Sequence, residues 1–187
     1  MKQSNPKWTH PGGKLIELGP ASLTGEELIA ILIGTGYKGK SAQDIAKELF
    51  NKYYSIAGLM GKKCSDLSDI KGLKKGKIAR IAAAFEMTKR IFSDKGWKLP
   101  NGRLLRLGLP GLTDAEVLAV IIGSGYGDKT SVGLSVELLN KYKTISGIGG
   151  KELYDMTMIR GLGDVKVVRI GAAFEVVCRV ARALEKE

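Results

Sequence analysis

The sequence has little of what most enzymes and metal sites use. Its 187 residues include one histidine, His10, and two cysteines, Cys64 and Cys178. One histidine in the N-terminal tail cannot complete a Ser–His–Asp or a Cys–His catalytic set. We therefore expect no enzymatic activity, and no bound metal ion, cofactor or small-molecule substrate.

Long apolar runs are missing as well. No stretch approaches the roughly 18–20 uninterrupted apolar residues that a membrane span requires, and residues 1–13 lack the apolar core of a secretory signal. The two cysteines fall at non-equivalent positions of the internal repeat described below, which argues against a disulfide framework. We expect a cytoplasmic protein that does not associate with membranes.

Acidic residues are few relative to basic ones. Lysine and arginine total 30 against 19 aspartate and glutamate residues, which gives a formal net charge of +11. Such an excess favours a polyanionic partner, with nucleic acid first. The alternative is a charge that serves solubility alone and has no partner.

What the sequence does contain is an internal repeat with a period of 89 residues. Trp8 corresponds to Trp97, and about 36 of about 84 paired positions are identical without a gap. A unit of roughly 80–90 residues is long enough to bury its own core. The repeat therefore predicts two tandem domains, a first copy over residues 8–92 and a second copy over 97–185, joined by a polar linker at 93–103.

Within each copy the pattern predicts short helices joined by turns. Leu-Thr-x-x-Glu at 23–27 and 112–116 has the form of a capping box at a helix start. Strand signals are weak throughout, so the predicted fold class is all-α, with about five helices in each copy. The expected helices cover residues 26–33, 41–53, 65–70 and 77–92, their counterparts in the second copy, and a last helix over 166–184. Residues 1–7 are expected to be a disordered tail, and residues 11–19 and 100–108 short lead-in segments.

Glycine turns between helices are the candidate functional elements. The clearest is Ile159-Arg160-Gly161-Leu162-Gly163, which a helix follows near Asp164. Glycine allows positive φ and a close approach of the backbone to another surface. The next helix presents free amides and the positive end of its dipole to a phosphate oxygen. Lys166, in the first turn of that helix, adds charge to the same contact.

This turn resembles the helix-hairpin-helix DNA-binding motif, and the whole unit resembles the amino-terminal domain of the RadC family. The resemblance rests on LIELGPASLTGEELIAILIGTGYKGKSAQDIAKELF and LSDIKGLKKGKIARIAAAFEMTKR and covers nearly all of both copies. It implies a compact unit, similar to the second domain of RuvA, that grips DNA backbones across the minor groove. It also implies that 34–40 and 123–129 form a second, more divergent hairpin in each copy.

RadC-family proteins carry a further metal-binding domain with a His-x-His motif, and a chain with one histidine lacks the ligands for that site. Glycosylases that share the hairpin place a catalytic lysine two residues after its second glycine, where this chain has Val165. Lys166 stands one residue late, and no suitable aspartate follows it. The resemblance therefore implies DNA binding without catalysis, in DNA repair or recombination.

The candidate DNA-binding residues are the turn glycines and the lysines beside them. In the first copy they are Gly34, Gly36, Lys38, Lys40, Gly72, Lys74, Lys75 and Lys77. In the second copy they are Gly123, Gly125, Lys129, Gly161, Gly163 and Lys166. Lys74 replaces the second glycine of the motif, and a lysine with positive φ would cost roughly 1 kcal/mol, so either Lys74 is strained or the turn is rearranged around Gly76. We therefore expect the second-copy turn to be the better phosphate site.

Three alternatives remain open. Each glycine could be a simple helix C-cap. Arg80 and Arg169 either reach outward or pair with Glu86 and Glu175. The other basic residues of the last helices, Lys89, Arg90, Arg179 and Arg182, are expected to be ordinary exposed charges. The alternative function is a protein-interaction module, which a large exposed apolar groove would favour.

Overall fold

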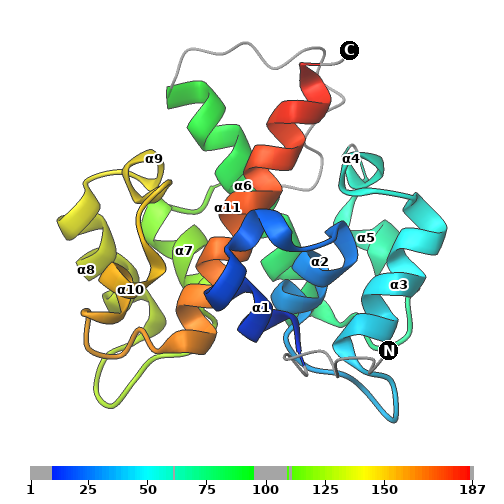
Figure 1. Ribbon diagram of the computed structural model, residues 1–187, viewed down its shortest axis with the longest axis horizontal. Helices are drawn as coiled ribbons and strands as arrows, with labels where there is room; N and C mark the ends of the chain where they lie inside the picture. The colour runs from blue at the N-terminus through cyan, green and yellow to red at the C-terminus, as the bar shows by residue number, and fades with distance from the viewer. Residues whose placement is uncertain (1–9, 61, 95–108, 110, 186–187) are drawn as a thin grey trace, which may run out of the picture.

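The computed structural model describes residues 10–60, 62–94, 109 and 111–185 (Figure 1). Helices and turns make up these segments, and apart from two isolated β-bridges the described residues contain no strand. The all-α prediction is confirmed. The expectations for residues 1–7 and for the segment 100–108 fall outside the described residues.

Each helix from α2 to α6 has a counterpart that begins 89 residues later. The first copy contains α1 (Pro11–Leu18), the 3-10 helix η1 (Pro20–Ser22), α2 (Gly25–Ile33), α3 (Ala42–Tyr53), α4 (Ile56–Leu59), α5 (Cys64–Leu67) and α6 (Lys75–Asp94). The second contains α7 (Asp114–Ile122), α8 (Ser131–Tyr142), α9 (Ile145–Ile148), α10 (Leu153–Thr157) and α11 (Asp164–Leu184).

The predicted capping boxes form as expected. The Thr24 hydroxyl accepts from the Glu27 amide at 3.1 Å, and the Glu27 carboxylate accepts from the Thr24 amide at 2.7 Å. Thr113 and Glu116 repeat both bonds at the start of α7. Desolvation raises the pKa of the Glu27 carboxyl, whereas the hydrogen bond from the Thr24 amide and the charge of Lys14 lower it. The net effect is a lowered pKa. These bonds fix where α2 and α7 begin.

Two expectations about the segments are corrected. The lead-in segment at 11–19 is mostly a helix, because Pro11 suits the first helical position and the His10 ring accepts from the Gly13 amide at 3.2 Å. The long helices start two residues earlier than expected, and α6 continues to Asp94, inside the predicted linker.

The buried apolar side chains form one continuous cluster that draws on both copies. Helices α6 and α11 pack on each other in the middle of the molecule, and each also packs on helices of the other copy. Helix α11 contacts α2 and α4, while α6 contacts α7 and α9. In Figure 1 these two helices cross the centre between the α2–α5 and α7–α10 groups. The two copies therefore share one core in the structure, and the boundaries 8–92 and 97–185 stay a prediction.

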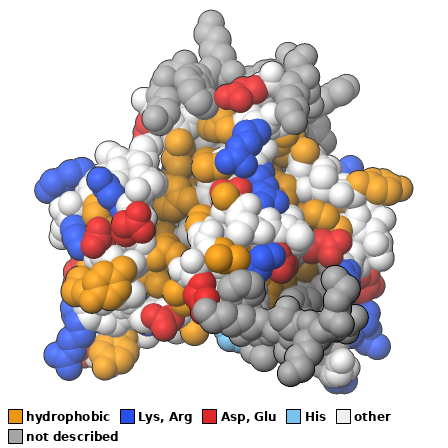
Figure 2. All heavy atoms as spheres, viewed as in Figure 1, with side chains coloured by type: hydrophobic (Ala, Val, Ile, Leu, Met, Phe, Trp, Pro, Cys, Tyr) orange, Lys and Arg blue, Asp and Glu red, His pale blue; other side chains and the backbone are white. Residues whose placement is uncertain are grey.

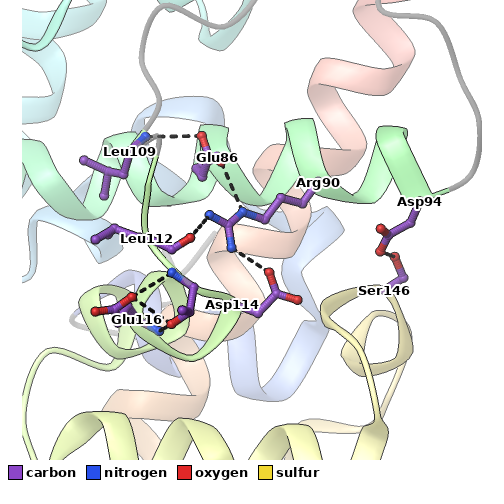
Figure 3. Close-up of polar contacts among 9 residues, drawn as sticks. Glu86, Arg90, Asp94, Leu109, Leu112, Asp114, Glu116 and Ser146 are labelled. Carbon is purple, nitrogen blue, oxygen red and sulfur yellow. Dashed lines mark hydrogen bonds and ion pairs between the residues drawn. The ribbon is translucent and has the colours of Figure 1, made fainter.

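A buried ion pair fastens the C-terminal half of α6 to the second copy (Figure 3). Glu86, 4% exposed, accepts from Arg90 at 3.1 Å and from the Leu109 amide at 3.2 Å. Arg90 also pairs with Asp114 at 2.5 Å and donates to the Leu112 carbonyl at 2.5 Å. Arg90 thus joins two copies, and the expectation of an ordinary exposed charge is wrong for it.

The same arrangement holds α11 against the first copy. Arg179 pairs with the buried Glu175 at 3.0 Å and donates to the carbonyl of Leu23. Arg182 reaches Glu175 at 3.4 Å but is 61% exposed, so it is closer to the expected surface charge. Both long helices are therefore held at their C-terminal ends by the copy to which they do not belong in sequence.

Candidate nucleic-acid interface

Glycine is required at the first position of the predicted hairpin turns. Gly72 and Gly161 have φ values of +97° and +108°, in the region that side chains avoid. A Cβ on Gly161 would lie 2.9 Å from both Leu134 Cδ2 and Tyr126 Cβ. This turn therefore packs directly on the loop that contains Tyr126.

The second glycine of the motif has no such requirement. Gly163 has φ −77° and ψ 174°, an extended conformation open to any residue, and a Cβ there would meet nothing within 4 Å. Its counterpart Lys74 is not among the residues with positive φ. Of the two alternatives, strain at Lys74 is ruled out, and with it that reason for preferring the second-copy turn.

The N-termini of α6 and α11 differ from those of α2, α3, α7 and α8 in how their backbone amides are capped. Side-chain oxygens cap α2, α3, α7 and α8. No side chain caps α11 at Gly163, and at the start of α6 the Lys74 side chain carries no acceptor. The amides of Lys77 and Lys166 already donate to the carbonyls of Lys74 and Gly163, so the amides of the first two residues of each helix are those that an anion can use.

The other two predicted hairpins, 34–40 and 123–129, are closed turns. The Tyr37 and Lys40 backbones exchange hydrogen bonds of 2.8 and 3.0 Å, and a Cβ on Gly36 would lie 2.0 Å from the Lys40 carbonyl oxygen. The Ser41 hydroxyl then caps the following helix at 3.0 Å. These loops supply side chains but no free helix amides.

The lysines of these loops differ in what they contact. Lys40 pairs with Glu48 at 2.7 Å, and Lys129 pairs with Glu137 at 2.6 Å. Lys38 is exposed and lies 5.6 Å from the centre of the Tyr37 ring. Of the three, Lys38 keeps its charge for an external partner.

Lysines of the first helical turn join the two loops within each copy. Lys77 Nζ donates to the Gly36 carbonyl at 3.1 Å. Lys166 Nζ donates to the carbonyls of Gly125 and Gly161 at 2.9 and 2.7 Å. Burial, followed by the charge of the neighbouring arginine, lowers the pKa of both lysines. Sequence analysis expected Lys166 to face a phosphate directly, whereas it first holds two loops together.

Arg80 and Arg169 lie where the two copies meet. Arg80 Nη1 donates to the carbonyls of Leu32 and Ile33 at 2.8 and 2.9 Å, and Arg169 Nη1 donates to that of Ile122 at 2.9 Å. They therefore bind the C-terminal ends of α2 and α7, and the alternative of ion pairs with Glu86 and Glu175 is not found among the described contacts. Sequence reasoning missed this position because each arginine reaches α2 or α7 across more than 40 residues of chain.

The loops of the two copies differ in charge. Segments 34–40 and 71–77 contain six lysines and no acidic residue, whereas 123–129 and 160–166 contain two lysines, one arginine and two aspartates. Lys71, Lys74 and Lys75 are exposed, and Lys74 lies 5.1 Å from the centre of the Tyr37 ring. The first copy thus presents the more positive loops.

Other kinds of site find no support in the described part of the chain. It holds no group of three or more His, Cys, Asp or Glu residues placed to bind a metal ion. None of its helices is long and apolar enough to cross a membrane. Cys64 and Cys178 are free, and desolvation raises the pKa of both thiols.

Known proteins resemble this chain in its repeated unit. A UPF0758 protein of Aliivibrio salmonicida is 39% identical over 90 residues, which cover 48% of this chain and 40% of that protein. One from Clostridium botulinum is 32% identical over 123 residues, covering 62% and 54%. The chain thus spans about half or less of the length of these relatives, and no solved structure gives a significant match. The model of the UPF0758 N-terminal family matches twice, over residues 3–79 and 97–168, and the chain belongs to that family.

Proposed function

We propose that this chain is a tandem duplication of a helix-hairpin-helix domain that binds DNA through its phosphate backbone, without catalysis and without a cofactor. Two features support the proposal: no side chain caps α11, and Lys74 before α6 offers no acceptor, with both helix starts behind a glycine turn and beside basic side chains. Backbone amides at a helix start suit a phosphate oxygen and carry no information about base sequence. Binding is therefore largely independent of DNA sequence. Such binding suits a cytoplasmic protein that acts in DNA repair or recombination.

The first-copy turn is the stronger site in this proposal. Lys71, Lys74 and Lys75 surround the start of α6, whereas Asp164 occupies the first position of α11. A carboxylate in the first turn competes with a phosphate for the same amides and repels it. Lys74, which departs from the motif, thus adds a contact and costs no strain.

A salt titration of duplex binding tests the proposal. Lys74→Gln and Lys75→Gln each remove one charge beside α6 and should each lower the slope of log K against log salt by roughly 0.9 for B-DNA. Lys89→Gln is the matched control, because Lys89 is an exposed lysine on the same helix, far from the turns. Equal binding by the wild type and both turn variants at low salt would contradict the proposal, as would an equal loss in the control.

A hollow of about 570 Å³ favours the second candidate, a protein-docking surface. It lies where α1, α10 and α11 meet, and Ile16 and Tyr154 at its border are 51% and 72% exposed. Figure 2 shows hydrophobic side chains gathered to the left of centre, in this part of the molecule. Tyr154→Ser should leave DNA binding unchanged and weaken capture of a protein partner, which separates the two functions.

A further inference from the structure

Two like charges meet at the boundary between the copies. A Cβ on Gly34 would lie 2.9 Å from Arg80 Nη1 and 3.2 Å from Arg169 Nη2, and one on Gly123 would lie 3.0 Å from Arg169 Nη1 and 3.9 Å from Arg80 Nε. Both guanidinium groups therefore reach from one glycine toward the other and lie side by side. Burial and the charge of Arg80 lower the pKa of Arg169, which reflects this proximity.

No carboxylate neutralises this pair within the described residues. Glu86 and Glu175, on the same helices, are already paired with Arg90 and Arg179. The carbonyls at the ends of α2 and α7 accept from Nη1 of each arginine. A guanidinium has five N–H donors, so Nε and Nη2 of both groups are left without an acceptor among the described residues. These donors are arranged as two neighbouring forks, which suits a tetrahedral oxyanion.

The pair is reachable from outside. Gly34 and Gly123 are exposed and have positive φ, so glycine at both places leaves the backbone above the guanidinium groups free of side chains. Arg169 lines a hollow of about 600 Å³ beside α1, α2 and α3, and Arg80 lines one of about 500 Å³ beside α7 and α8. Asp164 borders the first hollow and Glu116 the second, but neither pairs with these arginines.

The pair also lies beside the closed turns of both copies, next to Gly34 and Gly123. Gly34 and Gly123 begin the two closed turns, and each closed turn contacts the hairpin turn of its own copy through Lys77 or Lys166. The arginine pair is therefore connected to the hairpin turn of each copy through one closed turn.

We propose that Arg80 and Arg169 together bind one phosphate group at the boundary between the copies. This inference rests on the proposed function: the phosphate is a phosphodiester of the bound DNA. It is held between the loops of the first and the second copy. The two forks share its oxygens, which offsets the repulsion between the two guanidinium groups.

Duplex binding by the full chain should be compared for the wild type, Arg80→Lys, Arg169→Lys, the double Arg80→Gln/Arg169→Gln variant and Lys89→Gln. The lysine variants keep the charge and lose the fork, so they remain informative if the glutamine variant unfolds. We expect each lysine variant, checked by circular dichroism to be folded, to bind on the order of tenfold more weakly, while Lys89→Gln binds as the wild type. A second arm measures thermal unfolding with inorganic phosphate against chloride at equal ionic strength, where phosphate should protect the wild type more than the variants.

The outcomes separate this proposal from DNA binding itself. Folded lysine variants that bind DNA as the wild type does would overturn the arginine site and leave the proposed function intact. Absence of DNA binding by the wild type, together with phosphate protection that depends on both arginines, would support a site for free phosphate and overturn its assignment to DNA. Absence of both effects would overturn the site and the function together.

Discussion

At the scale of single residues, the two glycines of the hairpin turn have different roles. Gly161 is required by its backbone conformation and by its contact with Tyr126, whereas Gly163 is in an extended conformation with open space around it. Glycine at 163 instead leaves the α11 amides without a cap. Gly163 thus matters because it leaves backbone amides free to donate hydrogen bonds, and not because its backbone conformation requires glycine. A comparison of motifs alone does not separate these two reasons.

Gly163→Ser and Gly163→Ala test this difference. Both add a Cβ in open space, but the serine hydroxyl can cap the amides of α11 as threonine and serine cap α2 and α3. The serine variant should be more stable than the alanine variant by about 1 kcal/mol in urea unfolding. It should also bind duplex DNA more weakly, because its hydroxyl occupies the donors that a phosphate uses. Tighter or equal DNA binding by the serine variant would show that these amides do not contact DNA.

At the scale of elements, the sequence was sufficient to predict several helices, but not α1, α4 and α9, and not which helices pack together. Capping boxes and apolar spacing placed α2, α3, α7 and α8 within one residue at each end. Packing of α11 on α2, rather than mainly on α7, could not be predicted this way. The two copies carry equivalent apolar faces, so the pattern fits contacts within a copy and between copies equally well. The role of Arg90 was missed for the same reason, since it depends on which copy α6 contacts.

Removing Arg90 should show how much the exchanged contact contributes. Arg90→Met leaves Glu86 buried with the Leu109 amide as its remaining partner within the described contacts, and breaking a buried pair in this way costs about 3–5 kcal/mol. Arg182→Met is the control, because Arg182 is 61% exposed and Glu175 keeps Arg179; it should change the free energy of unfolding by less than about 1 kcal/mol. Equal effects in urea unfolding would mean that the buried pair contributes no more than a surface pair.

At the scale of the whole molecule, the shared core makes the two copies one folding unit. The long helices end in the opposite copy, where buried glutamate–arginine pairs hold them. A copy on its own would expose the face that α6 or α11 covers. Unfolding should therefore be a single transition that involves both copies.

Cleavage of the chain between the copies tests this unity. A protease site inserted within residues 95–108 would allow the 20.1 kDa chain to be cut into two fragments, one for each copy. After cleavage under native conditions the halves should remain together in size-exclusion chromatography, and each half expressed alone should lack a cooperative unfolding transition as a monomer. Halves that separate and keep their helical circular dichroism would show that each copy folds independently.

Because both copies belong to one chain, they need not be identical, and this affects how the protein can be oriented on DNA. Two identical subunits related by a twofold axis grip a duplex equally well in either orientation. Here the two copies have equivalent helices, but the lysine-rich turns belong to the first copy and the aspartates of the counterpart turns to the second. On the proposed function, the complex with DNA is polar: the chain distinguishes the two ends of the segment that it covers without reading a base.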